Sequence, residues 1–114
     1  MDDLAREVTR LADRLRSLTD VRLGRPLPPY GSRADAAHAV AQLMADAAAT
    51  LAGEPRRTVP RLNDFAVADQ VAVTGTDLVT AATAATAAQS APGVDLDVLV
   101  EAVLARCREL SAAL

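Results

Sequence analysis

The chain contains one histidine and one cysteine, and these two side chains limit the metal and nucleophilic chemistry that it could perform. Asp35 precedes His38 by three residues, the spacing of the carboxylate and histidine pairs that bind metals inside helical bundles. Those centres draw ligands from several helices, and the sequence holds no second pair of this kind. His38 is therefore the one candidate metal ligand, the alternative being a histidine at the edge or cap of a helix. We predict no catalytic residues, no cofactor and no enzymatic activity.

Cys107 cannot form an internal disulfide, because the chain has no other cysteine. Its neighbours at helical spacing, Val103 and Leu110, are apolar, which indicates a buried and unreactive thiol. One phenylalanine, one tyrosine and no tryptophan leave few rings that could stack on bases or sugars. The net charge of −3 also argues against general binding to polyanions. All twelve basic residues are arginine, a bias typical of GC-rich bacterial genomes.

Apolar residues at spacings of three and four predict four helices, which must position any site. The expected ranges, within a single domain of residues 1–114, are residues 2–19, 33–52, 64–90 and 95–113. In the third helix the apolar face keeps its phase through Gly75. We therefore expect this helix to continue unbroken, with Gly75 lying against a neighbouring helix.

Small residues dominate the two middle helices. Alanines at positions 34, 37, 41, 45, 48 and 52 form one stripe of the second helix, and its polar side is thin. The third helix carries Gly75, Ala82 and Ala85 on one face. Because small side chains let two backbones approach closely, these helices are expected to be antiparallel neighbours in close contact. The predicted fold is an all-α four-helix bundle with an up-down-up-down path.

Two surfaces of this bundle are candidates for binding. In the up-down-up-down order, six arginines gather at one pole, where they either complement the negative ends of helix dipoles or bind an anion, a nucleic acid or a partner: Arg6, Arg56, Arg57, Arg61, Arg106 and Arg108. The third helix also carries apolar side chains away from its main stripe, at Phe65, Val73 and Val79. These three are the predicted dimer surface, because exposed apolar patches mark protein contacts.

The stretch "SLTDVRLGRPLPPYGSRADAAHAVAQL", followed by "LAGEP", resembles the first two helices of the DinB-like bundle superfamily. It is most similar to the mycothiol-dependent maleylpyruvate isomerase type of actinobacteria. The resemblance implies that His38 corresponds to a metal-binding histidine, and it allows an up-down-down-up chain path as an alternative. The family's Gly-Trp before the helix is absent, Gln42 stands where a second histidine is expected, and no later histidine completes a metal triad.

The function predicted from the sequence is that of a non-catalytic interaction or scaffolding protein, expected to form a homodimer. One alternative is a degenerate maleylpyruvate isomerase-like domain that binds a small ligand. The other is a nucleic-acid or anion binder that uses the arginine pole. The N-terminus lacks a basic segment followed by an apolar run, so we expect no signal peptide and a cytoplasmic location. No segment is expected to cross a membrane.

Overall fold

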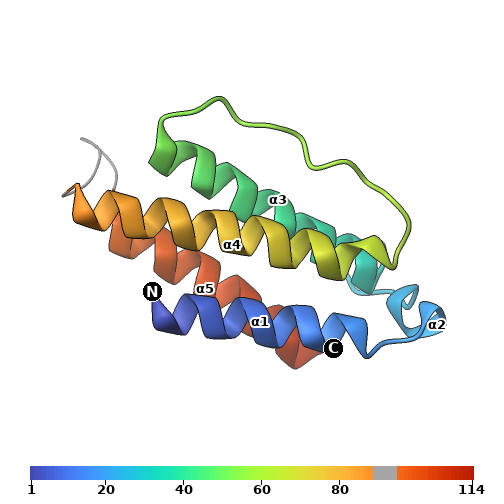
Figure 1. Ribbon diagram of the computed structural model, residues 1–114. Helices are drawn as coiled ribbons and strands as arrows, with labels where there is room; N and C mark the ends of the chain where they lie inside the picture. The colour runs from blue at the N-terminus through green and yellow to red at the C-terminus, as the bar shows by residue number, and fades with distance from the viewer. Residues whose placement is uncertain (89–94) are drawn as a thin grey trace.

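The computed structural model describes residues 1–88 and 95–114, and this part of the chain is all-helical (Figure 1). Its helices are α1 (Asp2–Arg16), α2 (Asp20–Leu23), α3 (Arg33–Ala52), α4 (Ala66–Ala87) and α5 (Leu96–Ala113). The four long helices correspond to the four that the sequence predicts, whereas the short α2 was not expected. The predicted end of the third helix at residue 90 and the turn that follows lie partly outside the described residues. Among the described helices, none has the length and apolar character that crossing a membrane requires.

Side-chain caps explain where several helices begin and end. The Ser32 hydroxyl accepts a hydrogen bond from the Asp35 amide, 3.1 Å away, at the start of α3. The Asp95 carboxylate does the same for Val98 at the start of α5, at 3.2 Å. α3 ends at Gly53, whose φ of +67° is a left-handed conformation that glycine adopts without strain.

The core combines bulky side chains of the first and last helices, α1 and α5, with many small side chains of α3 and α4. α1 contributes Leu4, Leu11 and Leu15, all fully buried. α3 and α4 make the most extensive contact of any pair of helices in the described residues, as their small side chains predict. Ala41 of α3 and Ala82 of α4 have no exposed surface. The stretch of alanine and threonine in α4 is therefore part of the core packing.

The relative direction of the middle helices differs from the expectation. α3 and α4 run in the same direction, and the segment between them returns along the length of α3 (Figure 1). Arg61, just before α4, is 3.1 Å from Asp35 in the first turn of α3, so both helices start at the same end. The predicted antiparallel arrangement is wrong. Thirteen residues of extended chain reach about 40 Å, more than the roughly 30 Å length of a 20-residue helix, so the connection can span α3.

α1 and α5 form the second parallel pair. Glu7 of α1 is 3.8 Å from Arg108 of α5, and the Arg14 guanidinium donates to the carbonyl oxygen of Leu114 at 2.8 Å. α1 and α4 run in opposite directions, because Arg16 at the end of α1 pairs with Asp69 near the start of α4. Along the chain the long helices therefore run up, down, down and up (Figure 1).

Gly75 lies at a close contact between two helices, although not between the pair that the sequence suggested. A Cβ atom at this glycine would lie 2.3 Å from one methyl carbon of Val8 and 2.9 Å from the other. The three atoms nearest to this position all belong to Val8, so Gly75 lets α4 approach α1. The prediction that Gly75 lies against a neighbour is confirmed, and the neighbour is α1.

Candidate functional site

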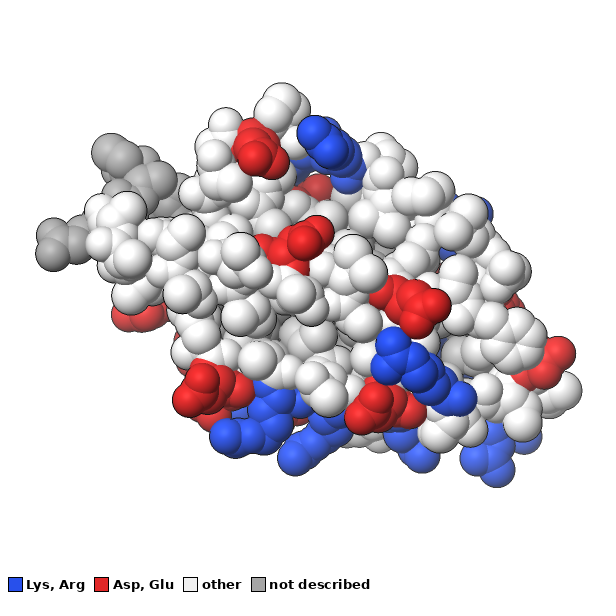
Figure 2. All heavy atoms as spheres, viewed as in Figure 1, with Lys and Arg blue, Asp and Glu red and all other residues white. Residues whose placement is uncertain are grey.

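The outward side of α4 exposes large apolar side chains. Phe65 and Val73 are 61% and 60% exposed, and they lie eight residues apart with Asp69 midway. Residues at this spacing share one side of a helix, and eight residues extend it by about 12 Å. We call Phe65, Asp69 and Val73 the α4 outer face. In Figure 2 the middle of the molecule, where α4 lies in the same view of Figure 1, is mostly uncharged, with separate carboxylate groups and a basic side chain among the uncharged atoms.

Val79, the third residue of the predicted dimer surface, does not belong to this face. Its side chain is half-buried and packs against the core cluster. Val79 directly follows the fully buried Leu78, and consecutive helix positions are about 100° apart. This position places Val79 at the border of the core. The predicted surface is therefore reduced to Phe65 and Val73.

The single charge of the α4 outer face is paired within the chain. The Asp69 carboxylate is 3.1 Å from the Arg16 guanidinium of α1, which also lies 3.3 Å from Asp13. The Asp69 side chain remains 78% exposed, so this ion pair adds little to stability. It neutralises the charge between Phe65 and Val73, and the next carboxylate on this side of α4 is the exposed Asp77, one turn after Val73.

The outward side of α3, by contrast, is covered. Residues 53–62, which we call the strap, run back along this helix with no regular secondary structure. The Gln42 side chain donates to the Arg57 carbonyl at 2.9 Å and accepts from the Val59 amide at 2.8 Å. From Arg33 to Leu51, every residue of α3 is buried or half-buried. The thin polar side of α3 therefore binds the strap.

His38 has a structural partner in the strap. Its Nε2 atom lies 2.8 Å from the carbonyl oxygen of Val59, and a carbonyl can only accept, so Nε2 carries the hydrogen. The side chain is half-buried on α3. In residues 1–88 and 95–114, no group of three or more His, Cys, Asp or Glu side chains is arranged to hold a metal ion. The geometry assigns His38 a role in holding the strap.

The six arginines of the predicted pole are not gathered at one end. Arg6 pairs with Asp3 in the first turn of α1, whereas Arg61 pairs with Asp35 and Asp64 at the opposite end of the molecule. The expected pole depended on the alternating order of helices, which the structure does not have. The other four are distributed over the strap and α5: Arg56, Arg57, Arg106 and Arg108.

The Asp35–Arg61 pair fixes the end of the strap. The hydrogen bond from the Arg61 guanidinium, 3.1 Å away, is the main reason that the pKa of Asp35 lies below its ordinary value. Arg61 also donates to Asp64 at 2.8 Å. One guanidinium therefore joins the first turn of α3 to the residues that lead into α4. Arg61 is engaged with two carboxylates, which counts against a role in anion binding.

Cys107 is fully buried, as its apolar neighbours predicted. Burial is the main cause that raises the pKa of its thiol to about 11, and the negative charge of Glu7 adds to the effect. Glu7 itself is buried and lies 3.6 Å from Arg10. Because nucleophilic attack needs the thiolate, this cysteine is unsuited to catalysis at neutral pH.

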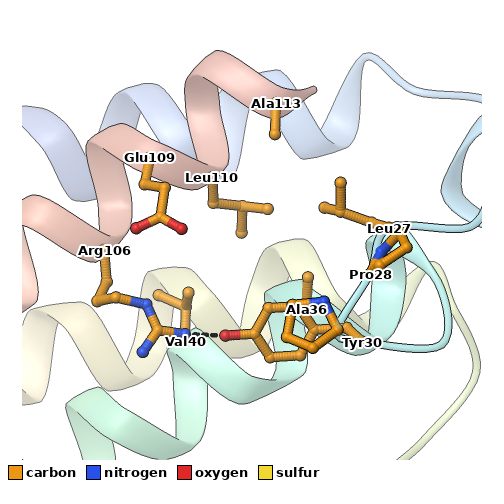
Figure 3. Close-up of a pocket in the computed structure, with 10 residues that line it drawn as sticks. Leu27, Pro28, Tyr30, Ala36, Val40, Arg106, Glu109, Leu110 and Ala113 are labelled. Atoms are coloured by element: carbon orange, nitrogen blue, oxygen red, sulfur yellow. Dashed lines mark hydrogen bonds between the residues drawn. The ribbon is translucent and has the colours of Figure 1, made fainter.

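A cavity of about 190 Å³ lies between the proline-rich loop, α3 and α5. Its polar side chains are Tyr30, Arg106 and Glu109 (Figure 3). Sequence reasoning did not bring these three residues together. The one feature of the sequence that could have pointed to this site is Tyr30, the only tyrosine, which ends a proline-rich segment two residues before Ser32, the cap of α3.

Comparison of the chain with protein-family models, with curated proteins and with solved structures found no match. The resemblance to the DinB-like superfamily therefore stays a hypothesis.

Proposed function

We propose that this protein is a non-catalytic interaction protein that forms a homodimer through the α4 outer face, on a four-helix bundle with an up-down-down-up path. The observation that supports the proposal is the exposure of Phe65 and Val73, each about 60%, on one side of a helix whose other side is tightly packed. Leu62, which is 53% exposed, precedes them in the chain. The buried thiol of Cys107 suits a reducing compartment, and we place the protein in the cytoplasm.

The spacing of the α4 outer face suits a two-fold arrangement. In a symmetric dimer the same patch is used by both copies. If the two-fold axis passes near Asp69, the α4 helices cross in opposite directions and Phe65 of one copy lies against Val73 of the other. Each copy then supplies one aromatic and one aliphatic side chain, and aromatic side chains such as Phe65 are enriched at protein interfaces.

The charges at the proposed axis are compatible with such a contact. Two Asp69 carboxylates would approach each other, and like charges repel. Each carboxylate, however, already lies 3.1 Å from Arg16 of its own chain. The negative Asp69 of one copy can therefore lie near the positive Arg16 of the other copy, which reduces the repulsion at the axis. Only four apolar anchors are buried in total, so the dimer is expected to dissociate on dilution.

The test is sedimentation velocity over a range of protein concentrations with two matched variants. Val73→Asp introduces a charge on the α4 outer face, while Val98→Asp introduces the same charge at an equally exposed valine of α5, 65% exposed. We expect the wild type and Val98→Asp to dimerise as concentration rises and Val73→Asp to stay monomeric. A wild type that is monomeric at every concentration, or equal loss of the dimer in both variants, would refute the proposal.

A further inference from the structure

The cavity between the proline-rich loop, α3 and α5 is large enough for a small organic molecule. Its volume is about 190 Å³, and a dry protein cavity of about 150 Å³ holds benzene. Apolar side chains form much of its wall: Leu27, Ala36, Val40, Leu110 and Ala113. In Figure 3, Leu27 of the loop and Leu110 of α5 point toward each other across this space.

The loop side of the cavity is held in place by the backbone. The Arg33 amide donates to the Arg25 carbonyl at 2.9 Å, which closes the loop at the start of α3. Leu27 and Tyr30 face each other as an isolated β-bridge inside this loop. The wall that carries Tyr30 is therefore preorganised, which lowers the cost of binding.

Tyr30 and Arg106 present hydrogen-bond donors at the same rim. The Arg106 guanidinium donates to the Tyr30 oxygen and lies 5.9 Å from the centre of its ring. Since the tyrosine oxygen accepts this bond, its own hydroxyl hydrogen can be donated to a further acceptor. The guanidinium has five N–H groups, so it can also reach a second acceptor. An anionic oxygen beside both side chains would receive a hydrogen bond from each.

Glu109 adds a negative charge to the same cavity. It lies three residues after Arg106 on α5, and its carboxylate points toward the rim that Arg106 and Tyr30 form (Figure 3). Within the described residues, Glu109 makes no ion pair at 4.0 Å or less. A carboxylate in this place repels ligands with several negative charges and attracts an ammonium group.

We propose that this cavity binds a free aliphatic α-amino acid. The ligand's carboxylate accepts hydrogen bonds from Arg106 and Tyr30, its ammonium group faces Glu109, and its branched side chain fills the apolar part. The three groups of the ligand match the three kinds of wall in the cavity. The cavity contains no residue of α4, so this site is separate from the proposed dimer contact.

The experiment is a titration of the ¹⁵N-labelled full chain with three probes that share one isobutyl group: L-leucine, 4-methylpentanoate, which lacks the ammonium group, and 3-methylbutylamine, which lacks the carboxylate. We expect saturable amide shifts in the loop and in the last turns of α5, with leucine binding tightest. Arg106→Gln removes a charge-assisted hydrogen bond and should weaken leucine binding about tenfold or more. Arg108→Gln, two positions along the same helix and outside the cavity, should leave it unchanged.

Glu109→Gln tests the contact with the ligand's ammonium group separately from the contact with its carboxylate. It should not disturb the core, because Glu109 is exposed. It should weaken leucine binding and leave the binding of 4-methylpentanoate equal or tighter. Absence of saturable shifts at the cavity with all three probes would overturn the proposal, and so would equal leucine affinity of Arg106→Gln and Arg108→Gln. The monomeric Val73→Asp variant should bind leucine like the wild type, so failure of the dimer and failure of this site are distinguishable.

Discussion

α3 and α4 lie side by side and run in the same direction, yet their outward sides differ. The outward side of α3 is polar and is covered by the strap, which hydrogen-bonds to His38 and Gln42. The outward side of α4 exposes Phe65 and Val73. The carboxylate between them, Asp69, is paired with Arg16 of α1, and a second carboxylate, Asp77, lies one turn after Val73. The polar side of α3 is thus covered by a segment of the same chain. Among the described residues, no segment of similar length covers the outward side of α4, which is why we assign the contact with a partner to α4.

The two faces of α4 can be compared by substitutions at adjacent positions. Gly75→Ala places a methyl group against Val8, a β-branched residue that cannot turn away easily. Such overpacking costs about 1–3 kcal/mol, and the gain in helix propensity returns about 1 kcal/mol. We expect a net loss of up to about 2 kcal/mol in the free energy of unfolding, measured by urea denaturation. Thr76→Ala, on the exposed side, should change it by about 0.5 kcal/mol or less.

The Val8→Ala background provides the control for this prediction. With the valine methyl groups removed, the nearest atom given for the new methyl group is the Cβ carbon of residue 8, 3.1 Å away, so Gly75→Ala should cost much less and its higher helix propensity should offset most of the remaining cost. If Gly75→Ala costs the same in both backgrounds, the close contact between α1 and α4 is not the cause.

The attachment of the strap to α3 can be broken at Gln42. Gln42→Ala removes hydrogen bonds to the Arg57 carbonyl and the Val59 amide. Water replaces part of them, so the cost is expected to be about 1 kcal/mol. Amide hydrogen exchange at Val59 should accelerate markedly, because its N–H loses its acceptor. Thr83→Ala, which removes a hydroxyl bonded only to its own helix, should leave exchange at Val59 unchanged.

The acid response of the strap follows from Asp35. Its pKa is lowered in the folded state, mainly by the hydrogen bond from Arg61, so the ionised form stabilises the fold. This contribution is complete above the unfolded pKa of about 3.9 and is lost as pH falls through the lower folded value. Because both side chains are partly exposed, we expect about 0.5 kcal/mol or less.

The measurement is the pH dependence of the free energy of unfolding. Asp35→Asn should be less stable than the wild type at neutral pH and equal to it at low pH. Asp77→Asn, on α4, is the matched control, because Asp77 makes no ion pair at 4.0 Å or less within the described residues. An Asp35→Asn variant as stable as the wild type at neutral pH would contradict a role for the Arg61 contact.

The helices themselves could be predicted because their signals are local. The apolar spacing defined the four long helices, and residue types that commonly cap helices, Ser32, Gly53 and Asp95, lie at their ends. The order of the helices could not be predicted in the same way. It depends on where the strap binds, and the hydrogen bonds that hold it join residues 17 and 21 positions apart. The polar residues of α3 could have faced either solvent or a covering segment of the chain, and the sequence did not distinguish these two environments.

The two candidate sites also differ in whether a local sequence pattern could predict them. The exposure of Phe65 and Val73 followed from their positions off the apolar stripe of α4, which is a property of one helix. The cavity joins Tyr30 to Arg106, 76 positions away, so no spacing within one element could reveal it. The arginine pole was predicted wrongly because it assumed the alternating order of helices.

Disulfide trapping between copies tests the role of the α4 outer face most directly. In a Cys107→Ala background, a mixture of Phe65→Cys and Val73→Cys proteins should cross-link faster than either protein alone, because the two-fold arrangement brings Phe65 of one copy to Val73 of the other. A Val98→Cys protein should cross-link slowly in every mixture. If the mixed pair forms no faster than the Val98→Cys control, the α4 outer face is not where two copies meet.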